Sequence, residues 1–516
     1  MQLDQEIIST PKPSQRSESA PLTQRREEVD AVSSAIFDVA IIGGGINGAC
    51  LYHELCARGY RAILVDKGDF AGGTSQTSAM WIWGGLRYLA RAELATVIRL
   101  SASRDLMVRT LAHAITPQTF RLLAGPQRPG GAERGLLAGL YLYWMLGGFR
   151  RRLPHRESNF PERELLGNSA SRLALCYEEA RVRPSDARFV LSWILPHRNP
   201  DRPALNYCPL GGGRWDAARK QWRLELTDLI LYRQFEARVR CVVNAAGCWT
   251  DTINACFGRA SPWQHLFGRG VFIGIRRDPR HHSPLIMRME NHDAMSLIPW
   301  GPVSLWGPAD SLVASPEEGF EPSFRDVPHL IDQLNRHLAR PLTPESIVSM
   351  RRGVRPLAVA RSRADTRAPI EHLSRRSAIY RDPELPWISV YGGKLTYCLA
   401  LAHSVAARVA EIVEPSASDR SLPMSAPAPQ TETFPGLAAP VLSARWCAKH
   451  ELCWTLEDYL RRRTNIAQWV ARGGLGERMQ NRHRINEIAG QIGGFRGQDT
   501  QSMASAYAGG ADQEIA

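Results

Sequence analysis

The stretch from Phe37 to Asp66 constrains the fold of this chain more than any other feature. Its first part, Val39 to Ile42, is a short apolar run bounded by glycine, as a parallel strand buried on both faces should be. The turn GGGINGA follows, then a helical segment, and then a second apolar run from Ala62 to Val65 that ends at Asp66. This order predicts a βαβ unit that binds a dinucleotide.

Each of the three glycines in this turn has a physical role. Gly43 permits the tight turn, Gly45 lets the backbone approach a pyrophosphate, and Gly48 lets the helix pack closely on the strand. The phosphates then meet the free N–H groups at the helix N-terminus. Asp66 lies about 20 residues past the glycines, where a carboxylate accepts hydrogen bonds from a ribose 2′-hydroxyl.

Two further segments favour a flavin over a nicotinamide. The loop GGTSQTSAMWIWGGLRYL, Gly72 to Leu89, is rich in Gly, Ser and Thr and suits a cofactor's phosphates and ring. Much later, Cys241 to Trp249 reads CVVNAAGCW, an apolar strand that ends in Ala246 and Gly247. Such a late return strand is expected when a substrate domain is inserted into a flavin-binding fold, so FAD is the predicted cofactor.

Four segments in order carry a resemblance to a known family: GGGINGA with the Asp66 strand, GGLRYL (84–89), GVRPL (353–357) and YGGKLT (391–396). Weaker matches are SDARFVL (185–191), VNAAGCWTD (243–251), LIPWGPVSLWGPAD (297–310) and LEDYLRRRT (456–464). The chain resembles the flavin-dependent glycerol-3-phosphate dehydrogenases, within the D-amino-acid-oxidase-like FAD oxidoreductases, as a diverged member. Colinear matches from Phe37 to Gly494 are much harder to obtain by chance than one motif.

The residues that we assign to FAD binding lie in these segments. They are Gly43, Gly45, Asn47, Gly48, Asp66, Lys67, Thr74, Ser75, Ser78, Gly84, Gly85, Ala246, Gly247, Trp249, Gly393, Lys394, Leu395 and Thr396.

A phosphorylated polyol needs cations for its dianion, and the motifs supply three beside glycines: Arg87, Arg355 and Lys394. The resemblance places all three around the substrate, in front of the flavin ring, and we assign them as catalytic. Tyr88 either hydrogen-bonds the substrate or packs its ring.

A fourth cation is assigned with looser spacing. Arg367 follows GVRPL, and Arg361 or Arg363 could take its place.

Departures from the family pattern concentrate near the substrate. The family's SSKLIHGGLRYL is here SAMWIWGGLRYL, so Met80 replaces a lysine and Trp83 a histidine. A second family histidine, a candidate base, is replaced by Phe272, which cannot accept a proton. The family's GTTD is here GPAD, ending in Asp310. Trp83 and Phe272 are therefore assigned as apolar substrate contacts.

Three interpretations of these changes stay open. The substrate is a related but less polar hydroxy or amino compound; or glycerol 3-phosphate is still oxidised with another base, His265, His281 or His282; or the protein binds flavin without turnover. We predict the enzyme: oxidation of a secondary alcohol of an anionic, phosphorylated polyol to a ketone, by hydride transfer to flavin N5.

Composition bears on the compartment of the protein and on the kinds of partner that it binds. The ten cysteines include no C-x-x-C pair and read as reduced thiols of a cytoplasmic protein, and no metal-ligand cluster is visible, so no metal is expected. A formal charge of +13 suits an anionic substrate or an anionic membrane. Nucleic acid would also attract this charge, but no recognisable nucleic-acid module accompanies it.

Membrane contact is an open question at the most apolar segment, GLLAGLYLYWMLGGFRRR (135–152). Its apolar part is about 15 residues, short of the roughly 20 that span a bilayer. It is either a buried helix of the substrate domain or a monotopic insertion with arginines at lipid headgroups. Because members of the resembling family pass electrons to membrane quinone, the resemblance favours peripheral contact with the inner face of the cytoplasmic membrane. Quinone or O₂ is the expected acceptor, and a homodimer is a candidate assembly.

The anchors predict an α/β chain: a Rossmann-type FAD-binding domain, an inserted α+β substrate domain with antiparallel strands near 271–275 and 296–306, and a small helical C-terminal domain. The FAD domain is discontinuous within 37–420, at about 37–121, 186–247 and 351–414, and the substrate domain fills 122–185 and 248–350. A disordered extension (1–36), a Pro- and Ser-rich linker (421–440), the helical domain (441–494) and a flexible tail (495–516) complete the chain.

Overall fold

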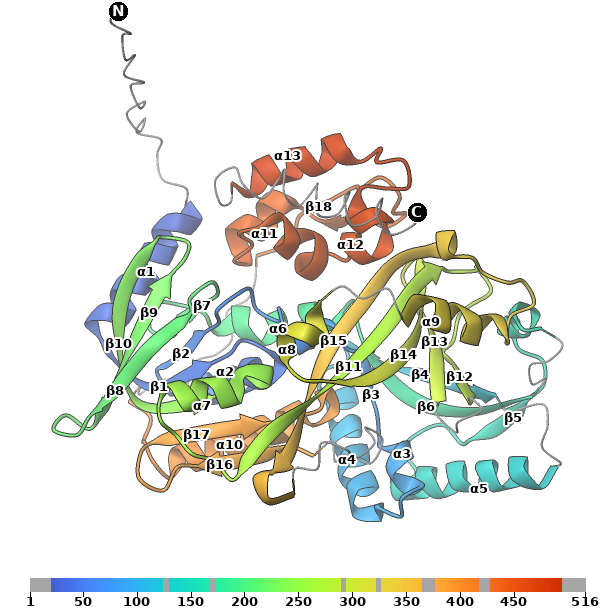
Figure 1. Cartoon of the computed structure of the whole chain (residues 1–516), viewed down its shortest axis with the longest axis horizontal. Coiled ribbons are helices and arrows are strands. Elements are labelled where there is room, and N and C mark those ends of the chain that lie inside the picture. The colour runs from blue at the N-terminus through green and yellow to red at the C-terminus, as the bar shows by residue number, and fades with distance from the viewer. Residues whose placement is uncertain are drawn as a thin grey trace, which may run out of the picture.

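A computed structural model describes residues 20–123, 130–167, 173–288, 294–321, 326–363, 376–416 and 427–493. Two sheets and a C-terminal group of helices make up the described chain (Figure 1). The first sheet lies on the left of that view, the second on the right, and the C-terminal helices lie above both. This arrangement confirms the predicted α/β class.

The first sheet is the dinucleotide-binding sheet, with the order β16-β17-β10-β1-β2-β7 and a β8–β9 hairpin on β10. Its strands are β1 (Ile36–Ile42), β2 (Ala62–Val65), β7 (Ala204–Leu205), β8 (Leu210–Asp216), β9 (Gln221–Asp228), β10 (Arg233–Asn244), β16 (Ala378–Arg381) and β17 (Trp387–Tyr391). Strand β1 pairs in parallel with β2 and with the late return strand β10. The predicted βαβ unit and return strand are therefore confirmed.

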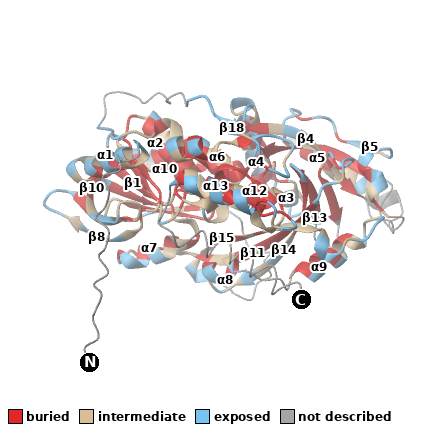
Figure 2. Ribbon diagram, turned by 90° about the horizontal axis from the view of Figure 1, so that it is seen from above, coloured by how far each residue is buried: buried red, intermediate tan, exposed pale blue. Residues whose placement is uncertain are grey.

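Three helices cover one region of this sheet: α2 (Ile46–Ala57), α6 (Asp186–Ile194) and α10 (Cys398–Ala410). Their apolar faces form one core with the buried side chains of β1 and β2. Buried residues follow the strands of both sheets, while exposed residues lie on the outer helices and turns (Figure 2).

The second sheet is mainly antiparallel, with the order β15-β11-β14-β13-β12-β4-β6-β3 and β5 beside β6. Its strands are β3 (Trp81–Ile82), β4 (Ile115–Leu123), β5 (His155–Glu157), β6 (Ala174–Val182), β11 (Trp263–Arg276), β12 (Leu285–Arg288), β13 (Ala294–Trp300), β14 (Val303–Val313) and β15 (Ile347–Ala360). The predicted antiparallel strands near 271–275 and 296–306 are confirmed as β11, β13 and β14.

Two predicted domain boundaries differ from the structure. Strand β3 and most of β4 fall inside the segment 37–121 assigned to the FAD domain, and most of β15 falls inside 351–414. All three strands nevertheless belong to the second sheet. Strand β15 pairs with β11 along its length, with Arg355 opposite Gly268. An apolar strand pattern shows that a strand forms, but not which sheet accepts it.

The prediction of a disordered N-terminal extension over 1–36 is wrong from Ala20 onward. Helix α1 (Ala20–Ser34) packs on β10. Its composition is polar, but Val29 and Val32 are fully buried, and Arg25 forms a buried ion pair with Asp228 at 2.6 Å. Residues 1–19 lie outside the described part of the chain.

The C-terminal helices form the predicted helical region. They are α11 (Ala444–His450), a π-helical turn (Asp458–Arg463), α12 (Ile466–Trp469) and α13 (Arg482–Ile492), with a small hairpin of β18 (Thr431–Glu432) and β19 (Val441–Leu442). Phe434 is buried in this group's own core, so the second half of the predicted linker belongs to the folded unit. The rest of that linker up to 426, and the tail from 494, lie outside the described residues.

The most apolar segment forms helix α5 (Gly130–Leu146), which packs on α4 (Leu94–Thr110). Leu140 and Tyr143 are buried, whereas Met145 is 46% exposed. Among the described residues, no helix combines the length and hydropathy that crossing a membrane requires.

Candidate functional site

The glycine turn after β1 has the shape that a pyrophosphate needs. Gly43 has φ +105°, and a Cβ there would lie 2.6 Å from the carbonyl oxygen of Ala245. A Cβ at Gly48 would overlap the carbonyl oxygen of Gly43. In contrast, a Cβ at Gly45 would meet only the Ser75 Oγ, at 3.1 Å. The protein itself therefore requires Gly43 and Gly48, while Gly45 leaves room that suits a phosphate approaching the N-terminus of α2.

Asp66 stands at the end of β2, as predicted. Its carboxylate accepts hydrogen bonds from Gly44 N at 2.7 Å and Gly68 N at 2.9 Å. Burial raises the pKa of Asp66 from the usual 3.8 to about 6. Because a carboxylate offers about four lone-pair sites, two backbone donors leave acceptor capacity for a ribose hydroxyl. These residues fit the adenosine and pyrophosphate parts of FAD.

The loop after Asp66 links the turn to the second sheet. Ser75 Oγ accepts a hydrogen bond from Ile46 N at 2.9 Å, at the first residue of α2. Thr74 Oγ1 donates to the carbonyl of Val354 on β15 at 2.5 Å. Ser78, also assigned to FAD, donates its hydroxyl to Asp186 at 2.8 Å, so this side chain has a partner within the protein.

The end of β10 reaches the same loop. Gly247 has φ +58°, and the Trp249 side chain follows within one short turn. Lys67 Nζ lies 3.6 Å from the centroid of the Trp249 ring, and Trp249 Nε1 donates to Glu317 at 2.8 Å. The predicted residues Lys67, Ala246, Gly247 and Trp249 are thus neighbours of the loop that carries Thr74.

Three predicted motifs meet beside the N-terminus of α2. Asn47 Nδ2 donates to the carbonyl of Gly392 at 2.9 Å, which joins GGGINGA to YGGKLT. Thr396 Oγ1 accepts from Trp83 N at 2.9 Å, which joins YGGKLT to the segment before GGLRYL. Lys394 Nζ donates to Tyr88 Oη at 2.5 Å and lies 4.1 Å from the centre of its ring.

Short local elements carry the remaining residues of these motifs. Gly85, with φ +95°, precedes α3 (Leu86–Leu89), and Gly393 has φ +127° before the 3₁₀ turn Leu395–Tyr397. A Cβ at Gly393 would meet the amide of Asn47. Both glycines therefore have backbone conformations that other residues rarely adopt.

The predicted cations occupy different environments. Arg355 lies over Gly270 of β11 and pairs through Nη1 with Asp310 at 2.6 Å. The carbonyl of its neighbour Pro356 lies 3.5 Å from a Cβ built at Gly392, so GVRPL adjoins YGGKLT. Arg87 lies exposed on α3. Arg367 lies outside the described residues.

Arg361, the alternative to Arg367, has structural partners. Its guanidinium binds Gln264 at 2.9 Å and pairs with Asp251 at 3.2 Å, and this side chain is half exposed. For Arg363 the structure describes only the backbone.

An aromatic cluster includes Trp83, the residue that stands where the family pattern has a histidine. The Trp81 ring centroid is 4.5 Å from that of Trp83 and 4.5 Å from that of Phe120. Phe272 is buried in the same core, at 3% exposure, and Met80 is fully buried. Met80 and Phe272 thus belong to the same large apolar core, against which Trp83 packs.

The histidines proposed as alternative bases are engaged elsewhere. Nε2 of His265 accepts from Gly392 N at 2.9 Å. His281 is buried, its Nδ1 lies 2.7 Å from Ser304 Oγ, and burial lowers its pKa to about 4. The backbone of His282 binds Glu162 and Gln118. His265 thus holds the turn that precedes Lys394, and the interpretation that one of these three histidines acts as the base stays a prediction.

Sequence reasoning missed the acids that hold the site together. Glu179 on β6 is fully buried and accepts from Gly84 N at 3.0 Å and from the Tyr143 hydroxyl. Asp186 binds Ser78 and pairs with Arg351 at 2.6 Å. Burial raises the pKa of Glu179. No local signal marks these residues as partners of the motifs, because each comes from a distant element.

One group of potential metal ligands exists among the described residues: His155, Glu157 and Cys176 on β5 and β6. Arg121 donates to the Glu157 carboxylate through Nε at 2.8 Å and Nη2 at 3.3 Å. This guanidinium already neutralises the carboxylate and would repel a dication, so we assign no metal to the group.

Comparisons with known proteins agree with this geometry. The family model described as FAD dependent oxidoreductase matches residues 38–408. The D-erythritol 1-phosphate dehydrogenase of Brucella abortus is 29% identical over 375 residues, covering 71% of this chain and 72% of that protein. The aerobic glycerol-3-phosphate dehydrogenase of Escherichia coli is 27% identical over 372 residues, covering 71% and 72%.

Among solved structures, the glycerol-3-phosphate dehydrogenase from Bacillus halodurans complexed with FAD matches with a TM-score of 0.57 and 20% identity, covering 75% of this chain and 67% of that one. At this identity the match shows the fold.

Proposed function

The chain belongs to the FAD dependent oxidoreductase family, as an enzyme of the glycerol-3-phosphate dehydrogenase type with FAD as its cofactor, and we propose that it oxidises a secondary alcohol of a phosphorylated polyol to a ketone. The observation that carries this proposal is the meeting of Lys394, Tyr88 and the GVRPL strand beside the glycine turn. Two relatives, named for glycerol 3-phosphate and D-erythritol 1-phosphate, support a phosphorylated polyol as substrate.

The cations would bind the substrate's anionic group. The ion pair with Asp310 fixes one edge of the Arg355 guanidinium, whose planar fork suits phosphate oxygens. The ring and hydroxyl of Tyr88 fix the Lys394 ammonium, which acts as a point charge. Arg87, on the exposed side of α3, completes the set. Because two of these groups are preordered by protein contacts, little conformational entropy is lost when they bind the anion.

Bound FAD would supply the oxidation by accepting a hydride from the alcohol carbon at N5. The residues of the chain hold that carbon in place and exclude water on the side of Trp81, Trp83 and Phe120. With His265 and His281 engaged elsewhere, we propose that water takes the hydroxyl proton.

A second candidate substrate follows from the same aromatic cluster. Trp83 and Phe272 stand where the family has polar residues, so a less polar hydroxy or amino compound that keeps an anionic group would gain apolar contacts there.

Steady-state kinetics with an artificial electron acceptor test the proposal. We expect phosphorylated polyols to have a much higher kcat/KM than their unphosphorylated parents. Arg355→Ala should raise KM for the phosphorylated substrate about 10- to 100-fold, since a hydrogen bond to a charged group is worth about 1.5–3 kcal/mol, and should leave FAD bound.

Arg361→Ala is the matched control. The half-exposed Arg361 follows β15 and is already held by Gln264 and Asp251, so its loss should leave KM unchanged. Equal kcat/KM for phosphorylated and unphosphorylated substrates, or an unchanged KM in Arg355→Ala, would contradict the proposal.

Peripheral membrane contact is proposed for the surface at the end of α5. Leu142 and Met145 on α5 are 38% and 46% exposed, and Phe149 and Leu153 in the segment that follows the helix are 60% and 54% exposed. The Arg152 side chain beside them is 80% exposed. Apolar side chains next to exposed arginines suit the boundary between acyl chains and anionic headgroups. Quinone or O₂ as electron acceptor, and a homodimer, stay predictions.

Sedimentation with anionic phospholipid vesicles tests this contact. We expect Met145→Ser combined with Phe149→Ser to reduce the bound fraction, and Tyr232→Ser, at an exposed aromatic residue (77%) in another turn, to leave it unchanged. Equal binding of all three proteins would contradict the assigned surface.

A further inference from the structure

The loop from Asp66 to Ser78, which we call the cofactor loop, packs against the glycine turn that is assigned to the FAD pyrophosphate. Phe70 packs where a Cβ on Gly44 would be, and Ala71 N donates to the carbonyl of Gly44 at 3.0 Å. Farther along, Ser75 Oγ accepts from Ile46 N at the start of α2. The conformation of this loop therefore sets the conformation of the turn that receives the pyrophosphate.

We call the folded residues 427–493 the C-terminal unit, and two of its arginine side chains contact the loop. Arg462 donates through Nε to Asp69 Oδ2 at 2.5 Å and through Nη1 to Gln76 Oε1 at 3.3 Å. One guanidinium thus bridges residues that stand on either side of Thr74 and Ser75. Arg463 forks onto the same Asp69 carboxylate, with Nη2 to Oδ1 at 2.9 Å and Nη1 to Oδ2.

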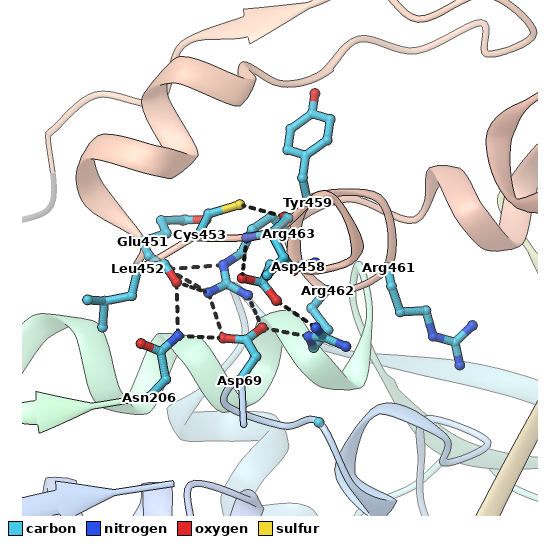
Figure 3. Close-up of polar contacts among 12 residues, drawn as sticks. Asp69, Asn206, Glu451, Leu452, Cys453, Asp458, Tyr459, Arg461, Arg462 and Arg463 are labelled. Carbon is cyan, nitrogen blue, oxygen red and sulfur yellow. Dashed lines mark hydrogen bonds and ion pairs between the residues drawn. The ribbon is translucent and has the colours of Figure 1, made fainter. Parts of the chain in front are cut away.

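Figure 3 shows Arg462 and Arg463 pointing at Asp69 from the π-helical turn, with Asp458 beside them. We call these four residues the charge cluster. Arg462 pairs with Asp458 at 2.6 Å and also with the partly exposed Glu457 at 2.7 Å, so both guanidinium groups face carboxylates.

The charge cluster is closed to solvent. The side chains of Asp69, Asp458 and Arg463 are fully buried and that of Arg462 is 4% exposed. Burial alone would raise the pKa of Asp69, but the guanidinium groups of Arg463 and Arg462 outweigh it and hold that pKa below its usual range. Removing one member would leave an uncompensated buried charge, which is costly.

Backbone groups extend the same contact. Arg463 also donates to the carbonyls of Glu451 and Leu452, and Asn206 links Asp69 to the Leu452 carbonyl at 2.8 and 2.9 Å. The contact therefore joins the loop, the segment after β7 and the C-terminal unit in one network.

From this geometry we propose that the C-terminal unit helps the protein to retain FAD, and we call this contact the clamp. Arg462 and Arg463 are its positioning residues, and they hold the cofactor loop through Asp69 and Gln76. The proposal rests on the FAD site and not on the identity of the substrate. Because the clamp and the cofactor both stabilise one loop conformation, weakening the clamp should weaken FAD binding.

The test measures FAD release from the full-length protein by the fluorescence of free flavin, without any substrate. Arg462→Lys keeps the charge opposite Asp69 and Asp458, but a single ammonium cannot also reach Gln76 with a planar fork. Gln76→Ala removes the other end of the bridge, together with the contacts of Gln76 to Arg461 and to the Gly72 carbonyl, and leaves the charge cluster intact. We expect each change to raise the FAD dissociation constant about tenfold or more.

Two further measurements separate positioning from general stability. Arg484→Gln removes an arginine that pairs with Glu432 and Glu487 inside the C-terminal unit, away from the loop, and should leave the FAD dissociation constant within about twofold. Thermal unfolding of the FAD-free protein should be similar for Gln76→Ala and the wild type, because ligand-free unfolding does not depend on FAD affinity.

A double-mutant cycle identifies the path. If Arg462 acts through Gln76, the double variant should bind FAD no more weakly than the weaker single variant. The proposal would be overturned if Gln76→Ala and a folded Arg462→Lys both bound FAD with wild-type affinity. It would also be overturned if the effects of the two substitutions on the free energy of FAD binding were strictly additive in the double variant. If Arg462→Lys does not fold, Gln76→Ala decides alone: wild-type binding overturns the clamp, and weakened binding with unchanged unfolding supports it.

Discussion

At the residue scale, Gly45 and Gly48 of the same turn differ in the space that surrounds them. A Cβ at Gly48 would overlap a backbone oxygen, whereas Gly45 has φ −77° and would meet only the rotatable hydroxyl of Ser75. We expect Gly48→Ala to destabilise the protein even without cofactor. Gly45→Ala should leave the unfolding temperature of the FAD-free protein near that of the wild type while FAD affinity falls, since the cofactor needs the space.

Calorimetry of the FAD-free variants and flavin titration check this pair. Full FAD loading of Gly45→Ala with wild-type affinity would contradict the assigned pyrophosphate site.

Asp66 predicts a pH dependence of FAD binding. Its pKa is raised to about 6, so the FAD-free fold favours the protonated form, and the stability that this group contributes is present at low pH and lost as pH rises through about 6. A ribose hydroxyl donates to the ionised carboxylate, so FAD binding should tighten as pH rises from 5 to 7, by at most about tenfold per pH unit, and level off above. Isothermal titration at several pH values checks this, and Asp66→Asn should remove the slope.

The sequence predicted the residues whose roles depend on the local backbone. Gly43, Gly48 and Asp66 follow from one βαβ unit, whose spacing is fixed by a strand, a turn and a helix. Asp310 and Glu179 could not be predicted as partners, because their positions depend on the register of strands far apart in the chain.

At the scale of elements, helix α5 is tied to the substrate motif GGLRYL. Glu179 on β6 accepts from both Gly84 N and the Tyr143 hydroxyl, and a Cβ at Gly84 would overlap Tyr143 and Arg151. Gly84→Ala should therefore lower the free energy of unfolding by about 1–3 kcal/mol and raise KM, because Arg87 follows three residues later.

The control lies on α5 itself. A Cβ at Gly135 would meet nothing within 4 Å, so Gly135→Ala should raise the free energy of unfolding by about 0.5–1 kcal/mol. Denaturant titration measures both variants, and a destabilised Gly135→Ala or an unaffected Gly84→Ala would contradict the account of this contact.

Two elements show why local patterns mislead. Helix α1 reads as disordered because its composition is polar, but its stability comes from Arg25, which finds Asp228 some 203 residues away. Most of strand β15 lies within 351–414, which was assigned to the FAD domain, yet its backbone pairs with β11 in the second sheet. Long-range pairing, which propensity does not encode, decided both cases.

At the scale of the whole molecule, the cofactor loop is where three parts of the protein meet. Thr74 joins it to β15 of the second sheet, Ser75 to α2 of the first, and Gln76 to the C-terminal unit. The C-terminal unit also contacts the second sheet directly, where Ser349 Oγ donates to the Gln468 carbonyl at 2.8 Å. FAD binding should therefore stabilise the assembly of all three parts.

The family and the cofactor follow from the comparisons, whereas the substrate does not, because Trp83 and Phe272 replace polar residues of the family pattern. The central claim is that this site uses FAD to oxidise a phosphorylated polyol. Anaerobic addition of sn-glycerol 3-phosphate to the purified flavoprotein, followed by absorbance near about 450 nm, tests it most directly. We predict that the flavin is bleached by the phosphorylated polyol and not by glycerol; a flavin that stays oxidised with both, and with D-erythritol 1-phosphate, would contradict the account.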